Sequence, residues 1–310
     1  MSALICGSLA YDTIMVFPDQ FKNHILPDKV HILNVSFLVP RMRREFGGCA
    51  GNIAYNLKLL GGDPIPMATV GQDFGPYREW FTEQAIRLEQ VKVIDELFTP
   101  QAFITTDLDN NQITAFHPGA MMRSYENHVN DVAGVTFGIV SPDGREGMIQ
   151  NATEFAEAGI PFIFDPGQAM PLFNGAELRH FIEQADYVTV NDYESNLLQE
   201  RPGGSENDIM RRVKAYITTR GPHGSRIHTA EKTYDIPPAH ERRVTDPTGC
   251  GDAFRAGLIF GIEKGYDWLT IGRMGNLMGA LKVEHPGTQN QRFDYDEFNE
   301  QFKQQFGYSL

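Results

Sequence analysis

The sequence lacks the features that mark membrane proteins, secreted proteins and thiolate metal sites. Its 310 residues contain no apolar run of about 18 residues, so no transmembrane helix is predicted. The first residues carry no basic segment, which favours a buried first strand over a signal peptide. The three cysteines, Cys6, Cys49 and Cys250, have no CxxC spacing, and so sparse a set is typical of the reducing cytosol. We therefore expect a cytoplasmic protein without a zinc site.

Basic residues are also scarce. The chain has 27 Lys and Arg against 40 Asp and Glu, which gives a formal net charge of -13 at pH 7. Such an acidic chain is not expected to bind nucleic acid or an anionic membrane non-specifically. A small anionic ligand is still compatible with this charge, because helix N-termini and a few local bases can bind phosphate.

Two common phosphate-binding patterns are absent. No GxxxxGK[ST] string occurs, which excludes a P-loop enzyme. No combination of HRD-like and DFG-like motifs indicates a protein kinase either. Any phosphate chemistry must therefore use another kind of loop.

A glycine-rich loop at residues 246–252, with the sequence DPTGCGD, is the candidate. It leads directly into the apolar run at 253–261, so it reads as a loop that becomes a helix with unpaired first amides. The amides of Gly249, Cys250 and Gly251 are suited to bind a transferring phosphoryl group, and Asp252 is suited to act as the base. The alternative is an ordinary glycine-rich turn before an acidic first helical turn.

The rest of the chain alternates between strand and helix patterns, which predicts a mostly parallel sheet covered on both faces. Polar residues follow several predicted strands, where α/β proteins bind ligands: Asp12, Asp165, Asn191, Thr219 and the 246–252 loop. Strands are expected at 3–9, 65–70, 135–140, 160–164, 187–190 and 215–219, and helices at 51–60, 76–88, 145–158, 176–184, 249–262, 268–283 and 295–306. A polar and aromatic excursion at 12–46 and a hairpin around the 109–111 turn are expected to form a separate small β lid.

Four motifs in order along the chain resemble those of the PfkB (ribokinase-like) family of carbohydrate and nucleoside kinases. They are GGCAGN at 47–52, NDYE at 191–194, TRGPHG at 219–224 and DPTGCGD at 246–252. The resemblance implies a single ribokinase-like domain over residues 1–310. Its three-layer α/β/α body would contain a mostly parallel central sheet, and a small β-sheet lid would be formed by about 12–46 and 97–120.

The resemblance also implies roles for individual residues. Asp252 would be the catalytic base, and the amides of Gly249, Cys250 and Gly251 would stabilise the transferring phosphoryl group. Magnesium would be held by Asn191 and Glu194, mainly through water. The remaining expected contacts are Thr219, Gly221 and Gly224 along ATP, Asn276 near its adenine, and Asp12, Gly47, Gly48, Asn52 and Phe116 at the acceptor.

The acceptor is less defined than the chemistry. The chain looks more like the bacterial adenosine-kinase branch than like ribokinase, which implies phosphorylation of the adenosine 5′-hydroxyl to AMP in purine salvage. Phe103 and Phe116 are placed to stack on a purine, or else they only pack the lid. The alternatives are a kinase for ribose, fructose or a related sugar, and a binding protein without catalysis. Potassium is a further candidate cofactor, and both a monomer and a homodimer are compatible with the sequence.

Several residues have a second interpretation. Asp12 could be a turn residue, and Asn52 only a polar residue of its first helical turn. Asn191 is a natural N-cap, which is compatible with a magnesium role. Other open alternatives are a site-facing or turn-capping Asp165, a reactive low-pKa thiol at Cys250, and solvated or phosphate-contacting Arg41, Arg43 and Arg44.

Overall fold

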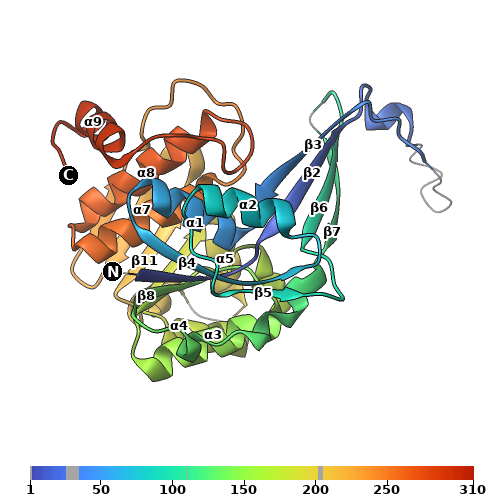
Figure 1. The fold of residues 1–310 in the computed structure, drawn as a ribbon. Helices are drawn as coiled ribbons and strands as arrows, with labels where there is room; N and C mark the ends of the chain where they lie inside the picture. Colours follow the sequence, from blue (N-terminus) through green and yellow to red (C-terminus); the bar gives the residue numbers. More distant parts are fainter. Residues whose placement is uncertain (1, 26–34, 110, 202–204) are drawn as a thin grey trace.

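The main body is built on a nine-stranded sheet (Figure 1). The computed structural model describes residues 2–25, 35–109, 111–201 and 205–310. Residues 26–34 of the predicted lid and Asn110 of the predicted turn lie outside the described residues. Across the sheet the strands are β13 (Thr233–Ile236), β12 (Ser225–Thr229), β11 (Ala215–Thr219), β10 (Tyr187–Asn191), β9 (Phe162–Phe164), β8 (Val135–Val140), β1 (Ser2–Cys6), β4 (Asp63–Gly71) and β5 (Val91–Ile94).

The direction in which the chain crosses this sheet reverses next to β1. From β1 the chain moves outward to β4 and β5, and it then returns to β8 and proceeds through β9, β10 and β11 on the other side. Neighbouring strands from β5 to β11 are parallel, whereas β12 and β13 are antiparallel. In such sheets the crevice at the carboxyl ends of the strands, beside the reversal, is the usual ligand site.

Helices cover both faces of the main sheet. Figure 1 shows α1, α2, α7 and α8 on one side and α3 and α4 on the other. Two buried apolar clusters, one on each side, fill the space between these helices and the sheet. The helices are α1 (Cys49–Leu59), α2 (Gly75–Glu83), α3 (Arg145–Ala158), α4 (Gly175–Gln184), α5 (Asp192–Glu200), α6 (Glu206–Met210), α7 (Cys250–Lys264), α8 (Trp268–Val283) and α9 (Tyr295–Phe306).

The helix lengths bear on membrane insertion. Within the described ranges, no helix combines the length and the apolar character that a membrane crossing requires.

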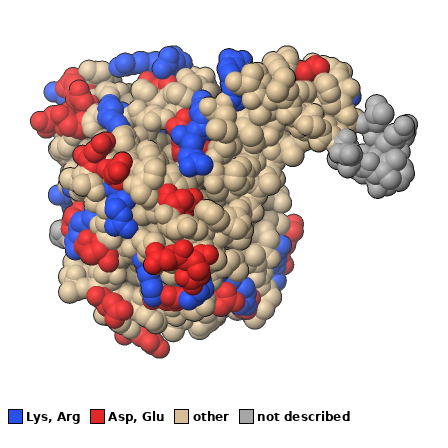
Figure 2. Space-filling view, turned by 45° about the vertical axis from the view of Figure 1, so that its right-hand side comes forward, with Lys and Arg blue, Asp and Glu red and all other residues tan. Residues whose placement is uncertain are grey.

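A four-stranded sheet projects from this body as an arm (Figure 1). In Figure 2 the arm presents mainly uncharged side chains, while Lys, Arg, Asp and Glu are interspersed over the body. This arm is the predicted small lid sheet. Its strands, in the order β3-β2-β6-β7, are β3 (Arg41–Gly47), β2 (Ala10–Val16), β6 (Gln101–Thr106) and β7 (Gln112–His117).

Strand pairing in the small sheet decides which side chains share a face. Asp12 pairs with Ala102, and Ala102 pairs with Phe116, so Asp12 and Phe116 lie on the same face. Phe103 pairs with Thr13 and therefore lies on the opposite face, because successive side chains alternate along a strand. The interpretation in which Phe103 stacks on an acceptor bound at Asp12 is therefore wrong. Phe116 remains a candidate for that contact.

The predicted ribokinase-like α/β/α fold is confirmed, but some boundaries differ. The chain leaves the main sheet after Cys6, so the predicted strand at 3–9 is divided between the end of β1 and the turn before β2. Helix α2 ends at Glu83, not at residue 88, because Ala85 adopts a left-handed φ of 51°. Strands β5, β12 and β13 and helix α6 were not predicted; all four are short.

Candidate active site

Two helices that are distant in the sequence meet at their first turns. Asn52 lies in the first turn of α1, and Asp252 lies in the first turn of α7. The Asn52 amide donates a hydrogen bond from Nδ2 to Oδ2 of Asp252 at 2.8 Å. The GGCAGN and DPTGCGD motifs are thereby joined at one point, beside the carboxyl ends of the main-sheet strands.

A buried polar network holds the side-chain oxygen of Asn52. Gln289 donates from Nε2 to Oδ1 of Asn52 at 3.1 Å, and Trp80 donates to Oε1 of Gln289 at 2.9 Å. Asn52 is only 4% exposed. This geometry favours a role in orienting Asp252 over the sugar contact that the sequence led us to expect. Gln289 was missed by the sequence analysis, since it follows no recognisable motif.

Asp246 organises the loop that precedes α7. Its Oδ1 accepts the Thr248 amide at 3.0 Å, and its Oδ2 accepts the Gly287 amide at 2.9 Å. Burial raises the pKa of Asp246, but these amide hydrogen bonds outweigh that effect and leave the pKa below its usual range. Gly249 caps α7 with φ 80°, a left-handed conformation that favours glycine. The loop thus has a defined shape before any ligand binds.

The amides at the start of α7 differ from the expected set. Cys250 donates its amide to the Pro247 carbonyl at 3.2 Å and closes a turn, so in this conformation it does not join the anion site. Among the hydrogen bonds of the described residues, the Gly249, Gly251 and Asp252 amides have no backbone acceptor, as expected at the start of a helix. Two of the three expected amides, those of Gly249 and Gly251, therefore remain candidate donors to an anion, and the Asp252 amide is a further one.

The Cys250 thiol is not reactive in this setting. Burial is the main cause that raises the pKa of Cys250 to about 11; the charge of Lys282 opposes it, and the charges of Asp246 and Asp252 add to it. The thiol is therefore protonated at neutral pH. This contradicts the alternative of a low-pKa nucleophile at the helix N-terminus.

A buried ion pair lies behind the anion site. Arg255 donates from Nη2 to Oδ1 of Asp165 at 2.6 Å, and its Nε contacts the other carboxylate oxygen. A Cβ added to Gly251 would lie 2.8 Å from Nη1 of Arg255, so the guanidinium lies directly against Gly251. Asp165 therefore neither faces the groove nor caps a turn. Arg255 was missed by the sequence analysis, although a lone charge inside an apolar helical run is a usable signal.

The same guanidinium tunes the expected base. Burial raises the pKa of Asp252, while the positive charge of Arg255 and the hydrogen bond from Asn52 lower it; the net direction is upward. A raised pKa makes a carboxylate a better proton acceptor at neutral pH. The arrangement can hold a transferring phosphoryl group at Gly251 and remove a proton beside it.

A groove of about 890 Å³ lies between the small sheet and the loops of the body. The pKa of Asp12, on its wall, is raised to about 6, mainly by burial and to a smaller extent by the charges of Asp252, Glu45 and Asp246. A Cβ added to Gly47 would lie 2.6 Å from Oδ2 of Asp12. The wall formed by the small sheet includes Asp12, Ile14, Val16, Arg41, Arg43, Glu45, Ile104, Thr106 and Gln112.

Gly48 and Phe116, two other expected acceptor residues, are not among the residues that line this groove. Gly48 has φ 85°, and a Cβ there would lie 2.4 Å from the Ser8 carbonyl, so only glycine fits this crossing. Phe116 is 52% exposed on the same sheet face as Asp12. Arg43 lies close to Glu45 and reaches Asp246 at 4.0 Å, whereas Arg44 packs over the Tyr11 ring.

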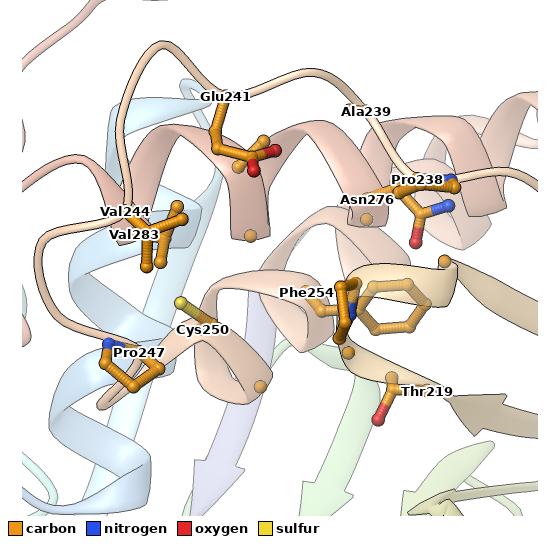
Figure 3. A pocket seen from close by; sticks show the side chains of 17 residues that line it. Thr219, Pro238, Ala239, Glu241, Val244, Pro247, Cys250, Phe254, Asn276 and Val283 are labelled. Atoms are coloured by element: carbon orange, nitrogen blue, oxygen red, sulfur yellow. The ribbon is translucent and has the colours of Figure 1, made fainter.

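A second cavity, of about 370 Å³, lies on the other side of the 246–251 loop. Figure 3 shows Thr219, Asn276 and Cys250 around it, with Pro247 at one end. The amide of Asn276 donates to the Pro237 carbonyl at 2.8 Å and closes one wall. The lining of this cavity is mostly apolar. It includes all the residues expected along ATP: Thr219, Gly221, Gly224 and Asn276.

Asn191 and Glu194 begin α5 as a capping box. The Glu194 amide donates to Oδ1 of Asn191, and the Asn191 amide donates to Oε2 of Glu194, both at 2.8 Å. No cluster of three or more His, Cys, Asp or Glu suited to a metal occurs among the described residues. One carboxylate with few protein partners fits magnesium, which usually keeps several waters and binds substrate phosphates. The negative charge of Glu194 acts on Asp165, Asp252 and Arg255, which places it beside the site.

The architecture is that of the ribokinase-like small-molecule kinases. Ribokinase from Thermotoga maritima has the same fold at a TM-score of 0.81, with 20% identity and coverage of 98% of this chain and 99% of that one. The chain belongs to the pfkB family of carbohydrate kinases, whose family model matches residues 11–293.

More similar relatives are nucleoside kinases. The structure of Burkholderia thailandensis nucleoside kinase in complex with inosine is 53% identical, covers 99% of both chains and has a TM-score of 0.91. The same enzyme has also been solved in complex with ADP-inosine, at 55% identity, a TM-score of 0.88 and coverage of 99% and 97%. The nucleoside kinase of Methanocaldococcus jannaschii is 31% identical over 272 residues, which is 87% of this chain and 89% of that protein.

The Arg255–Asp165 pair gives a first prediction. Arg255→Met would leave a buried unpaired carboxylate and should cost about 3–5 kcal/mol of unfolding free energy. The double variant Arg255→Met/Asp165→Asn should regain most of that stability in urea unfolding. Its kcat should stay at least about tenfold below wild type, because the cation behind Gly251 is gone. A double variant with wild-type kcat would show that the pair is only structural.

The raised pKa of Asp12 gives a second prediction. Below about pH 6 the Asp12 carboxyl is protonated and no longer accepts two hydroxyl hydrogen bonds, so the acceptor KM should rise as the pH falls. In Asp12→Asn, acceptor KM should be higher at neutral pH and nearly constant across this range. Steady-state kinetics from acid to neutral pH measure both. If Asp12→Asn keeps the wild-type pH dependence of KM, another group is responsible.

Proposed function

We propose that this protein is an ATP-dependent nucleoside kinase that phosphorylates the 5′-hydroxyl of a purine nucleoside. The observation that carries the proposal is the position of the 246–252 loop between two cavities. A donor in the apolar cavity and an acceptor in the groove would reach the start of α7 from opposite sides. This is the in-line arrangement that phosphoryl transfer needs.

The chemistry follows from the residues at the start of α7. Asp252 would take the proton of the acceptor hydroxyl as the new O–P bond forms and the bond between the γ-phosphorus and the bridging oxygen breaks, releasing ADP. The Gly251 and Asp252 amides and the helix N-terminus would stabilise the charge on the transferring group. Asn52 would hold Asp252 in the orientation that accepts the proton.

Donor binding is supported by the apolar cavity and by a relative. The ADP-inosine complex of the Burkholderia thailandensis enzyme supports ATP as the donor. Glu194 and Asn191 would hold magnesium mainly through water. When bound, the ion would neutralise charge on the phosphates.

The choice of nucleoside over free sugar rests on the similar enzymes and on the groove. The 53% identical enzyme was solved with inosine, so inosine joins adenosine as an expected acceptor. Asp12 would accept hydrogen bonds from ribose hydroxyls, and Phe116 on the same face could stack on a base. A sugar kinase would make no use of an exposed aromatic ring two strands away from Asp12 on the same face.

The base assignment predicts the effect of Asp252→Asn. The amide keeps the size and the contact with Asn52 but cannot accept the proton, so kcat should fall by at least about a thousandfold. Calorimetry should still show binding of nucleoside and of ATP. The matched control Asp296→Asn, at the start of α9, should leave kcat unchanged. Near-wild-type turnover in Asp252→Asn would refute the assignment.

An acceptor panel tests the substrate class. With ATP and magnesium, coupled ADP detection should give a kcat/KM for inosine or adenosine at least about a hundredfold above that for ribose or fructose, because the base adds stacking contacts. Phe116→Ala should reduce this preference, and Phe103→Ala, on the opposite face, should not. A higher kcat/KM for a free sugar would support the sugar-kinase alternative.

A further inference from the structure

A lysine is completely buried where α8 meets the phosphate loop. Lys282 lies in the last turn of α8 and is 0% exposed, which is rare for a residue that carries a charge. Its Nζ donates to the Asp246 carbonyl at 2.7 Å and to the His285 carbonyl at 3.2 Å. The ammonium group therefore binds one backbone oxygen in the loop before α7 and one in the turn after α8.

The two segments that Lys282 joins both shape the anion site. Asp246 fixes the loop before α7 through its side chain, and the amides of Thr245 and Asp246 both donate to the Val283 carbonyl. The turn after α8 carries Gly287, whose amide binds the Asp246 carboxylate at 2.9 Å. A positive charge at this junction compensates the carbonyl oxygens, the Asp246 carboxylate and the C-terminal end of the α8 dipole.

We propose that the Lys282 ammonium is a built-in monovalent cation for this loop, and that it makes the kinase independent of potassium. The claim that turnover is independent of potassium rests on the proposed kinase function. The claim that Lys282 takes the place of a cation in the loop does not.

The geometry does not fit a potassium ion at the same place. Potassium binds backbone carbonyl oxygens, and the Asp246 and His285 carbonyls already accept hydrogen bonds from Nζ. An ion there would have to displace a tethered ammonium that is part of the fold and cannot diffuse away. The candidate potassium cofactor therefore has no role at this junction while Lys282 is present.

The charges around Lys282 favour this assignment. Burial lowers the pKa of Lys282; the negative charges of Asp246 and Glu45 oppose that effect only in part, so the net direction is downward. Arg43 is the nearby cation, and it is itself close to Glu45 at 3.4 Å. The case for a cation at this place therefore rests on the two carbonyl oxygens that accept from Nζ and on the Asp246 carboxylate beside them.

Wild-type enzyme gives the first test, without any mutation. Activity and Tm should be the same, within about twofold for kcat, in potassium chloride and in choline chloride of equal ionic strength, because choline is too large to replace potassium at a carbonyl site. A several-fold activation or a clear rise in Tm that is specific to potassium would overturn the proposal.

The variant Lys282→Met gives the second test. It should have a lower Tm and at least about tenfold lower kcat in choline chloride, and potassium or ammonium chloride should restore part of both. Lys303→Met, which changes an exposed lysine in the last turn of α9, should match wild type in both salts. A Lys282→Met enzyme with wild-type Tm and kcat in choline chloride would overturn the proposal.

Two further readouts keep the tests separate. If Lys282→Met does not fold, Lys282→Gln, which keeps a donor without the charge, should fold with a potassium-dependent Tm; a Tm that potassium does not change would overturn the proposal. If no acceptor is phosphorylated, the proposed function fails, but the Tm measurements still decide whether Lys282 replaces the ion.

Discussion

The hydrogen bond between Asn52 and Asp252 is the contact on which the site depends. It joins residues 200 positions apart and brings the first turns of α1 and α7 together. Asp252, which is held at this point, directly follows the 246–251 loop, whose residues line both the groove and the apolar cavity. Gln289 and Trp80 extend the contact into the core, so the orientation of Asp252 is set by buried packing and not by an exposed loop.

A second constraint is electrostatic: an acidic protein must still hold phosphates. With a net charge of -13, the surface offers no general attraction for them. The structure instead places two buried cations around the start of α7, Arg255 against Gly251 and Lys282 under Asp246. Buried charges are screened by salt much less than surface charges, so each acts strongly on the loop and little on distant anions. Binding is therefore local, and it suits small phosphate ligands.

The sequence predicted what local patterns encode. Most strands and helices and the small sheet follow from periodicity and turn residues, and the structure has them, whereas the four motifs were identified through their resemblance to the PfkB family. What it could not predict depends on distant partners: Gln289 supports Asn52, and Asp165 turns away from the groove toward Arg255. A usable signal was nevertheless present, since Arg255 and Lys282 are isolated charges within otherwise apolar helical runs. Such residues need a buried partner. Here Arg255 pairs with Asp165 behind the anion site, and Lys282 binds the carbonyl of Asp246 in the loop before α7.

Under the proposed function, the main body carries the residues that act on the phosphoryl group, and the small sheet carries residues that contact the acceptor. Asp252, Asn52 and Arg255 lie on α1 and α7 of the main body, and both helices pack in the same buried apolar cluster. Asp12 and Phe116 lie on the projecting small sheet, in which the starts of β2 and β6 and the ends of β3 and β7 lie together at one end. Register alone places these two side chains on the groove face, so under the proposed function substitutions along that row should affect the acceptor more than the base. The same alternation of side chains places Phe103 on the opposite face, away from the groove. Which residues face the groove therefore depends on strand register as much as on residue type.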